Sequence, residues 1–327
     1  MTEQTRRRDV WGMLLRAFAW GMVWVTFAFL LNNYLNFWRG WPGADTVFGT
    51  GATGLSWIQA GFYVVALGMA VALALRNDGR PLRSDSVAIS NIAAYIARAC
   101  FFAVTIVGIV DFTISFLRVE AMLPGLFGDR TATDLGLSRF RGPYIHVPLV
   151  ALGFVIAFFT RTLGFTWLTL LVVVAELQIV LGRFVFGYEQ AFMADLVRMW
   201  YAALFLFASA YTLVEEGHVR IDVFYAARSD QTKAIVNGLG SVFLGMVLCW
   251  VILIFGMASG SSAINATVLS FEQGQQGFGM FTKYFMAAFL AVFAVTMLVQ
   301  FSSYLLQAAA DYRGEPGKRE SASADGM

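Results

Sequence analysis

Charged side chains are scarce in this sequence. Asp, Glu, Lys and Arg together make up 13% of its 327 residues, and hydrophobic residues make up 58%. A soluble domain carries about 25% charged residues, so the composition excludes a water-soluble globular protein and indicates an integral membrane protein in the lipid bilayer. The formal net charge of +2 gives no indication of nucleic acid as a partner.

Cysteine and histidine are also rare. Cys100 and Cys249 each lie inside an apolar run, where an unpaired thiol behaves as a small hydrophobic side chain. His146 and His218 lie in different segments, so a bis-His haem or zinc site is not indicated, and no nucleophile accompanies His218. We therefore expect no disulfide framework, no metal site, no cofactor and no catalytic residue.

Long apolar segments fill most of the chain. They show no period-2 alternation, which favours helices over a closed barrel, the other structure that satisfies backbone groups in lipid. Each span needs about 20 residues. We predict an all-α membrane bundle of about eight transmembrane helices, over residues 12–35, 55–75, 88–117, 144–160, 163–183, 192–214, 235–259 and 283–308.

The segment 144–183 allows more than one interpretation. A single helix of this length would be about 60 Å long, about twice the hydrocarbon thickness, and would leave seven spans in total. Two spans that turn at Thr160, Arg161 and Thr162 fit better, although the turn is tight. A re-entrant or interfacial first half is a further alternative.

Positive charges gather at alternate ends of the predicted spans. Those on one side are Arg6, Arg7, Arg8, Arg16, Arg76, Arg80, Arg83, Arg161, Arg220, Arg228, Lys233, Arg313, Lys318 and Arg319. By the positive-inside rule this side is cytoplasmic, so both termini are expected there. The loop 118–143 on the other side is an exception, because it carries Arg118, Arg130, Arg139 and Arg141.

The same loop is the natural boundary between two membrane blocks. We predict an N-terminal extension of about three spans over residues 1–143 and a second membrane domain over 144–313. The polar residues 314–327 are expected to form a disordered tail, as chain ends often do.

Three short motifs stand in order in the C-terminal half. Arg-Phe-Val-Phe-Gly at 183–187 ends one apolar segment, Asp-Leu-Val-Arg at 195–198 opens the next, and Gly-His-Val-Arg-Ile-Asp at 217–222 follows it. This order resembles the DctQ type, the small membrane subunit of tripartite ATP-independent periplasmic (TRAP) transporters. The resemblance covers about residues 163–313, four spans, and the block 1–143 has no counterpart in the minimal four-span form.

The resemblance implies a non-enzymatic small permease subunit in a bacterial inner membrane. In such systems a large membrane subunit of the DctM type carries the substrate and sodium sites, and a periplasmic solute-binding protein delivers a small solute, commonly a carboxylate. The small subunit is then expected to support the large one mechanically during ion-coupled uptake. A self-sufficient channel or carrier, a membrane redox-enzyme subunit and a transient assembly factor are the alternatives.

Nine residues are candidates for structural or subunit-interface roles: Glu176, Arg183, Asp195, Arg198, Glu216, Gly217, His218, Arg220 and Asp222. For residues 216–222 the alternatives are that they cap a span, dock onto the partner subunit or form a solvated loop. Arg183 either snorkels to the interface or pairs with Asp195 across a short turn, and Asp195 can also pair with Arg198 on one helix face. Glu176, inside an apolar run, is expected to contact another helix or subunit. The alternatives are a proton or ion path and a protonated or interface-level carboxyl group.

Two further charged residues, Arg98 and Asp111, share the third apolar segment. They stand about 20 Å apart along a helix, too far to pair, and each is expected to snorkel toward a membrane surface. The aromatic residues Tyr144 and Tyr284 begin later spans and are expected to lie in interface belts.

Overall fold

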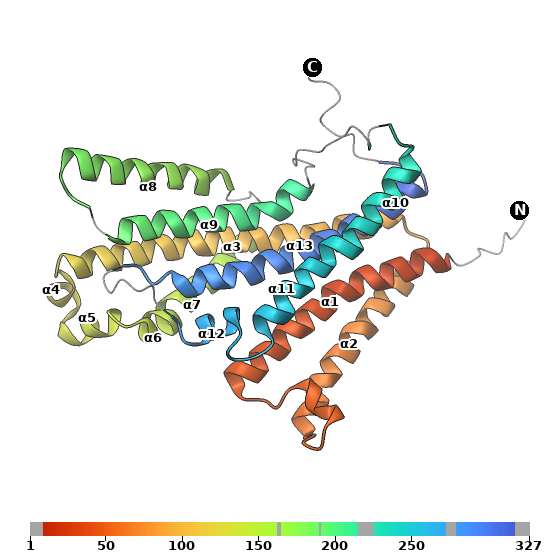
Figure 1. Cartoon of the computed structure of the whole chain (residues 1–327), viewed down its shortest axis with the longest axis horizontal. Helices are drawn as coiled ribbons and strands as arrows, with labels where there is room; N and C mark the ends of the chain where they lie inside the picture. Colours follow the sequence, from red (N-terminus) through yellow and green to blue (C-terminus); the bar gives the residue numbers. More distant parts are fainter. Residues whose placement is uncertain are drawn as a thin grey trace, which may run out of the picture. The chain divides into compact units, whose positions relative to one another are not determined.

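A computed structural model describes residues 9–161, 165–189, 191–214, 225, 227–272 and 279–317, and within these ranges every regular element is a helix (Figure 1). Eight helical segments of the described residues are long and apolar enough to cross a membrane, and two of them consist of α-helices joined by a π turn, so the predicted all-α bundle is confirmed. The α-helices are α1 Val10–Arg39, α2 Gly54–Arg76, α3 Leu82–Val119, α4 Leu123–Phe127, α5 Asp129–Leu135, α6 Ser138–Arg141, α7 Val147–Phe159, α8 Phe165–Val185, α9 Ala191–Val214, α10 Asp230–Gly240, α11 Val247–Met257, α12 Ala263–Leu269 and α13 Lys283–Tyr312.

Shorter helical turns connect some of these elements. Ala44–Phe48 is a 3₁₀ turn between α1 and α2, while Gly142–His146 and Ser241–Met246 are π-helical turns. The first π turn joins α6 to α7, so the fourth span runs from Ser138 to Phe159 and begins six residues before the predicted start at 144.

The fourth and fifth spans are separate helices. Helix α7 ends at Phe159, and Thr160 has an extended backbone, with φ −109° and ψ 141°. Helix α8 then begins at Phe165. The interpretation of 144–183 as one long helix, with seven spans in total, is therefore wrong.

The chain forms two compact units, each built from segments that are distant in sequence. Unit 1 contains Met1–Ala93, Thr212–Val251 and Met297–Met327, and unit 2 contains Ala94–Tyr211 and Ile252–Thr296. Helices α3, α9, α11 and α13 each contribute one part to either unit. The boundary at residue 143 between an N-terminal extension and a second domain stays a prediction.

In unit 1, small side chains let α1 and α2 pack closely. Ala66, Ala70 and Ala74 are buried at four-residue intervals along α2, and such small residues allow helix backbones to approach one another in a membrane. Arg16 of α1 and Asp85 of α3 form a buried ion pair of 2.8 Å. Glu315 accepts hydrogen bonds from the backbone N–H groups of Leu82 and Arg83, so the predicted disordered tail is fixed in place as far as this residue.

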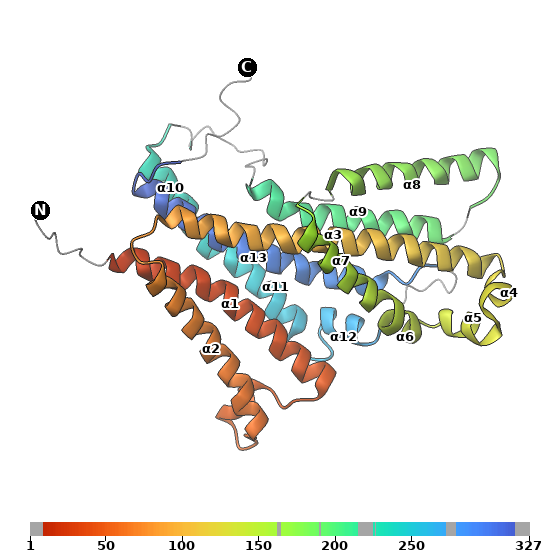
Figure 2. The same ribbon diagram turned by 180° about the vertical axis from the view of Figure 1, so that it is seen from behind.

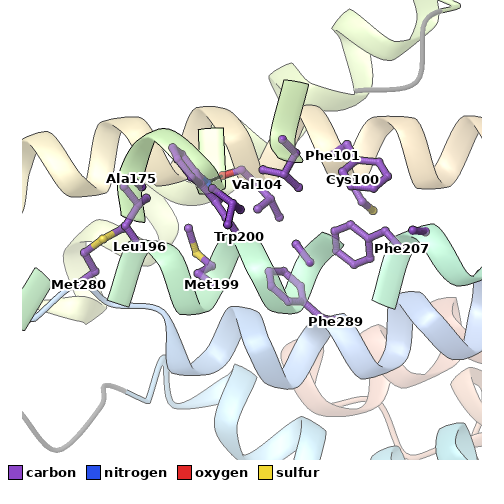
Figure 3. Close-up of a cluster of buried hydrophobic side chains, with 14 of the residues drawn as sticks. Cys100, Phe101, Val104, Ala175, Leu196, Met199, Trp200, Phe207, Met280 and Phe289 are labelled. Atoms are coloured by element: carbon purple, nitrogen blue, oxygen red, sulfur yellow. Dashed lines mark hydrogen bonds between the residues drawn. The ribbon is translucent and has the colours of Figure 1, made fainter. Parts of the chain in front are cut away.

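In unit 2, aromatic and sulfur-containing side chains fill the core between α3, α9 and α13. Figure 3 shows Trp200 beside Val104, to whose carbonyl its indole N–H donates (3.1 Å), and the rings of Phe207 and Phe289 side by side, with centroids 5.0 Å apart. Helix α8 lies along α9 and buries only a narrow face of Leu168, Val172 and Ala175 against this core (Figures 1 and 2).

Helix α7 also packs closely on α3 in unit 2. A Cβ atom built on Gly153 would lie 2.6 Å from the backbone nitrogen of Ala103, a separation that cannot be relieved by turning a side chain. Gly153 is therefore required for this helix contact.

Candidate functional site

Asp111 is the centre of a buried polar cluster in unit 2. The carboxylate lies two turns before the end of α3 and is 1% exposed. It accepts hydrogen bonds from Arg141 Nη1 (2.6 Å), from His146 Nε2 (2.9 Å) and from the backbone N–H of Phe281 (2.9 Å). Arg141 and His146 are as deeply buried as Asp111 itself, so this charge is compensated inside the protein.

The geometry also fixes which ring nitrogen of His146 faces Asp111. An arginine stays charged in proteins, so Asp111 pairs with it as a carboxylate, which can only accept hydrogen bonds. His146 Nε2 therefore carries the hydrogen that it donates to Asp111, and Nδ1 forms a hydrogen bond with the Tyr284 hydroxyl. This arrangement fixes both the ring of His146 and the first turn of α13.

Arg141 connects three further parts of unit 2. Its guanidinium donates to the Leu135 carbonyl (2.5 Å) and to the Ser115 hydroxyl (3.2 Å), and it stacks over the ring of Phe281 with 4.2 Å between the guanidinium carbon and the ring centroid. The loop 118–143 is thus tied to α3 through a fully buried arginine.

A second acidic residue, Asp195 of α9, accepts a hydrogen bond from the backbone of Met280, the residue before Phe281. Its Oδ2 accepts from the backbone N–H of Met280 (3.1 Å), next to Phe281, which Asp111 holds. Arg118 donates to the Gly279 carbonyl (3.4 Å) and lies over the Phe281 ring. We call Asp111, Arg118, Arg141 and Asp195 the 279–281 clamp.

The clamp has a clear physical rationale. Residues 279–281 precede α13, where backbone N–H groups lack helical partners and need other acceptors. Two carboxylates supply these acceptors, and negative charge near a helix N-terminus is also favoured by the helix dipole. The arrangement is therefore suited to fixing the start of the last span in position relative to the α3 and α9 segments of unit 2.

The structure confirms one predicted pair and corrects another. Asp195 and Arg198 pair at 3.4 Å on one face of α9. Arg183, by contrast, pairs with Glu189 at 3.4 Å, so the predicted alternative of a pair with Asp195 is wrong. The reason is the turn after α8, in which Gly187 adopts φ 64° and the N–H of Tyr188 bonds back to the Gly182 carbonyl, bringing Glu189 close to Arg183.

The other predicted site residues are not part of the clamp. Glu176 is exposed in the middle of α8, and it makes no hydrogen bond or ion pair with any other residue that the structure describes. Glu216, Gly217, His218, Arg220 and Asp222 lie outside the described residues.

Three residues do not lie as expected from the sequence. Arg98 and Asp111 were expected to snorkel toward a membrane surface, and Tyr284 was expected to lie in an interface belt. Asp111 turns inward to the clamp, and Tyr284 is 5% exposed beside His146. Arg98 donates to the Ala157 carbonyl of α7 (3.2 Å). In each case a partner from another helix was available, and an internal hydrogen bond replaces the one that the membrane surface would offer.

The sequence held one indirect signal for the clamp. An acid deep in an apolar run needs a cationic partner, and the loop 118–143 holds arginines that the positive-inside rule does not explain. Two of these, Arg118 and Arg141, are the arginines of the clamp. His146 and Tyr284 had no comparable signal, because nothing in their local spacing links them to Asp111.

The described residues contain no group of three or more His, Cys, Asp or Glu side chains placed to hold a metal ion. Cys100 and Cys249 are free and buried. The clamp contacts connect α3, α9 and the loop 118–143 to residues 279–281, which indicates a structural joint.

Comparison with known proteins finds a family model that matches part of the chain. The model of the family described as tripartite ATP-independent periplasmic transporters, DctQ component, matches residues 169–310. No curated protein and no solved structure matches the chain. The matched range contains Asp195 and residues 279–281, while Asp111 and Arg141 precede it. This match over residues 169–310 supports a DctQ-type small membrane subunit of a TRAP transporter, with an additional helical block before the matched range.

Proposed function

We propose that this protein supports a large DctM-type membrane subunit during ion-coupled uptake of a small solute, a carboxylate, that a periplasmic binding protein delivers. The match to the DctQ component over residues 169–310 carries the proposal. The role is mechanical and non-enzymatic, because a moving transport subunit needs a fixed reference in the bilayer.

The 279–281 clamp supports this mechanical role. Its hydrogen bonds hold the entry to α13, and its arginines stack on Phe281. Breaking one partner of a buried ion pair costs about 3–5 kcal/mol, so the joint resists displacement. Asp111, Arg118 and Arg141 all lie within 1–143, and we infer that this extension braces the DctQ-like domain 144–313.

The charge distribution supports an inner-membrane location with both termini in the cytoplasm. Arg141 is fully buried against Asp111, and Arg118 is engaged with Gly279 and Phe281. These two arginines therefore do not act as free flanking charges. Only Arg130 and Arg139 of loop 118–143 then remain as exceptions to the positive-inside rule. In this orientation the clamp lies toward the periplasm, the side from which a binding protein delivers solute.

The test is a deletion of this chain in a strain that retains the large subunit and the binding protein. The ligand that co-purifies with the binding protein is first identified by mass spectrometry, and its labelled form is then used for uptake. Uptake should be abolished and restored by a plasmid copy, while ligand binding to the binding protein is unchanged. Normal uptake in the deletion strain would refute the proposal.

A second measurement separates this role from that of a self-sufficient carrier. The purified chain alone in liposomes should show no flux of the same labelled ligand under a sodium or proton gradient, whereas liposomes that contain both membrane subunits and the binding protein should accumulate it. Flux through the chain alone would favour the carrier.

A further inference from the structure

Glu176 is a carboxyl group exposed at mid-membrane depth. Helix α8 runs from Phe165 to Val185, which places Glu176 about 15 Å from either end at 1.5 Å per residue. The hydrocarbon core is about 30 Å thick, so this side chain lies near its centre. It is exposed and makes no hydrogen bond or ion pair with the described part of the chain.

The contrast with Asp111 shows that the chain itself can satisfy such a group. Asp111 also lies inside a span, and three donors within unit 2 bind it. Glu176 has none among the described residues. Lipid tails offer no hydrogen-bond donor at this depth, and an ionisable group there usually faces protein or a water-filled cavity. A second protein that faces α8 can supply such a donor.

The surroundings of Glu176 form a continuous side of α8. Thr169, Glu176 and Arg183 recur every seven residues, about two helical turns, so they lie along one stripe of the helix. We call these three residues the α8 polar stripe. It runs along the edge of the narrow buried face of α8, and this helix is the least buried of the eight described spans, with 17% of its most apolar stretch inside the protein.

We propose that the α8 polar stripe packs against a transmembrane helix of the large subunit, and that this helix presents a cationic or hydrogen-bond-donating side chain opposite Glu176. The inference rests on the proposed function and names the surface through which the support is given.

Charge complementarity selects this partner over the alternatives. A lipid acyl chain has no donor for the carboxyl group. Two copies of this chain in one membrane share the same orientation, so symmetric packing of their α8 helices would place both Glu176 side chains at the same depth. Two carboxylates that share one site oppose each other, so this packing would require one of the pair to keep its proton. A different protein with a complementary side chain has neither defect.

The first experiment places a photo-crosslinking amino acid at Val180 or at Val174 in the full complex. Both valines lie on α8 and have similar exposure, 48% and 50%, which makes them matched positions. On a helix with 100° per residue, Val180 lies about 40° from Glu176, whereas Val174 lies about 160° from it. The probe at Val180 should crosslink to the large subunit at least several-fold more than the probe at Val174. Equal yields, or a crosslink from Val180 only to lipid or to a second copy, would overturn the proposal.

The second experiment measures how much large subunit co-purifies with Glu176→Leu and Glu176→Gln. Loss of an interhelical hydrogen bond in a membrane should reduce recovery about tenfold for the leucine variant, and less for glutamine, which keeps an acceptor oxygen. Gln178→Leu is the matched control, because this exposed polar side chain lies on α8 about 160° around the helix from Glu176, and its recovery should equal that of the wild type.

The purified chain alone checks that these variants fold. Because Glu176 has no described partner within the chain, its replacement by leucine should leave the melting temperature of the isolated chain unchanged or raise it. Recovery of the large subunit at or above the wild-type level with Glu176→Leu would refute the interface. If the wild-type chain itself fails to retain the large subunit, the proposed function fails instead, so the two failures are distinguishable.

Discussion

Replacing Asp111 by alanine removes the shared acceptor of Arg141, His146 and the Phe281 N–H group. Arg141 would then be a fully buried guanidinium without its carboxylate partner at 2.6 Å, a loss that costs about 3–5 kcal/mol in proteins. The backbone N–H of Phe281 would also lose its bond of 2.9 Å, which adds about 1–3 kcal/mol if the group stays buried. These terms overlap, and we expect a total destabilisation of about 4–6 kcal/mol.

The assay is reversible unfolding of the purified chain in detergent micelles, followed by circular dichroism or tryptophan fluorescence. Asp129→Ala is the control, because Asp129 is an exposed carboxylate in the first turn of α5, and surface changes usually stay within about 0.5 kcal/mol. The double variant Asp111→Leu with Arg141→Leu should recover much of the loss, since apolar replacement of a whole buried ion pair is often neutral. A loss below about 1 kcal/mol for Asp111→Ala, or a double variant worse than the sum of the single ones, would refute the reasoning.

Three further predictions use the same unfolding assay. Gly153→Ala should lower the unfolding free energy by about 1–3 kcal/mol, because the new methyl group overpacks against the Ala103 backbone. The control Gly61→Ala, with no atom within 4 Å of the new Cβ, should be neutral or slightly stabilising. Equal effects of the two variants would contradict the close contact of α7 with α3. Arg183→Gln should change the unfolding free energy by less than about 0.5 kcal/mol. The side chains of Arg183 and Glu189 are 62% and 51% exposed, and exposed ion pairs contribute little. A larger loss in the isolated chain would show a role of Arg183 that this contact does not explain. The hydrogen bond from Arg313 lowers the pKa of Asp9 below its ordinary value. The stability from this pair is therefore present above the ordinary pKa and is lost as the pH falls through the lowered one. Asp9→Asn should flatten the dependence of the unfolding free energy on pH in the acid range, and an unchanged dependence would contradict the assignment.

Hydropathy alone predicted the membrane spans well, for a physical reason. A span must be apolar over its whole length, so the signal is local and summed over about 20 residues. The eighth span was expected over 283–308 and is observed over Lys283–Tyr312. The start of the fourth was missed by six residues because Arg141 and the polar loop before it break the apolar run, although the helix continues through them as the buried Arg141 is paired with Asp111.

The clamp lay beyond such local arguments. Asp195–Arg198 was predicted because its members are three residues apart on one helix, whereas Asp111 and Phe281 are 170 residues apart. A contact of that separation depends on how spans pack, and one sequence carries no local trace of it. Asp111 was expected to reach the surface because a single helix offers it no other partner, and the packed bundle does.

The sequence separation within the clamp has a consequence for how the protein is made. Ribosomes add about 5–20 residues per second. Arg141 follows Asp111 by 30 residues and Phe281 follows it by 170, so these partners emerge about 2–6 s and about 9–34 s later. Until Phe281 emerges, the Asp111 carboxylate in α3 lacks one of its hydrogen-bond donors. The N-terminal block, although synthesised first, therefore reaches its final structure only when the last span has been translated, and a nascent chain that stops before residue 281 leaves this block incomplete.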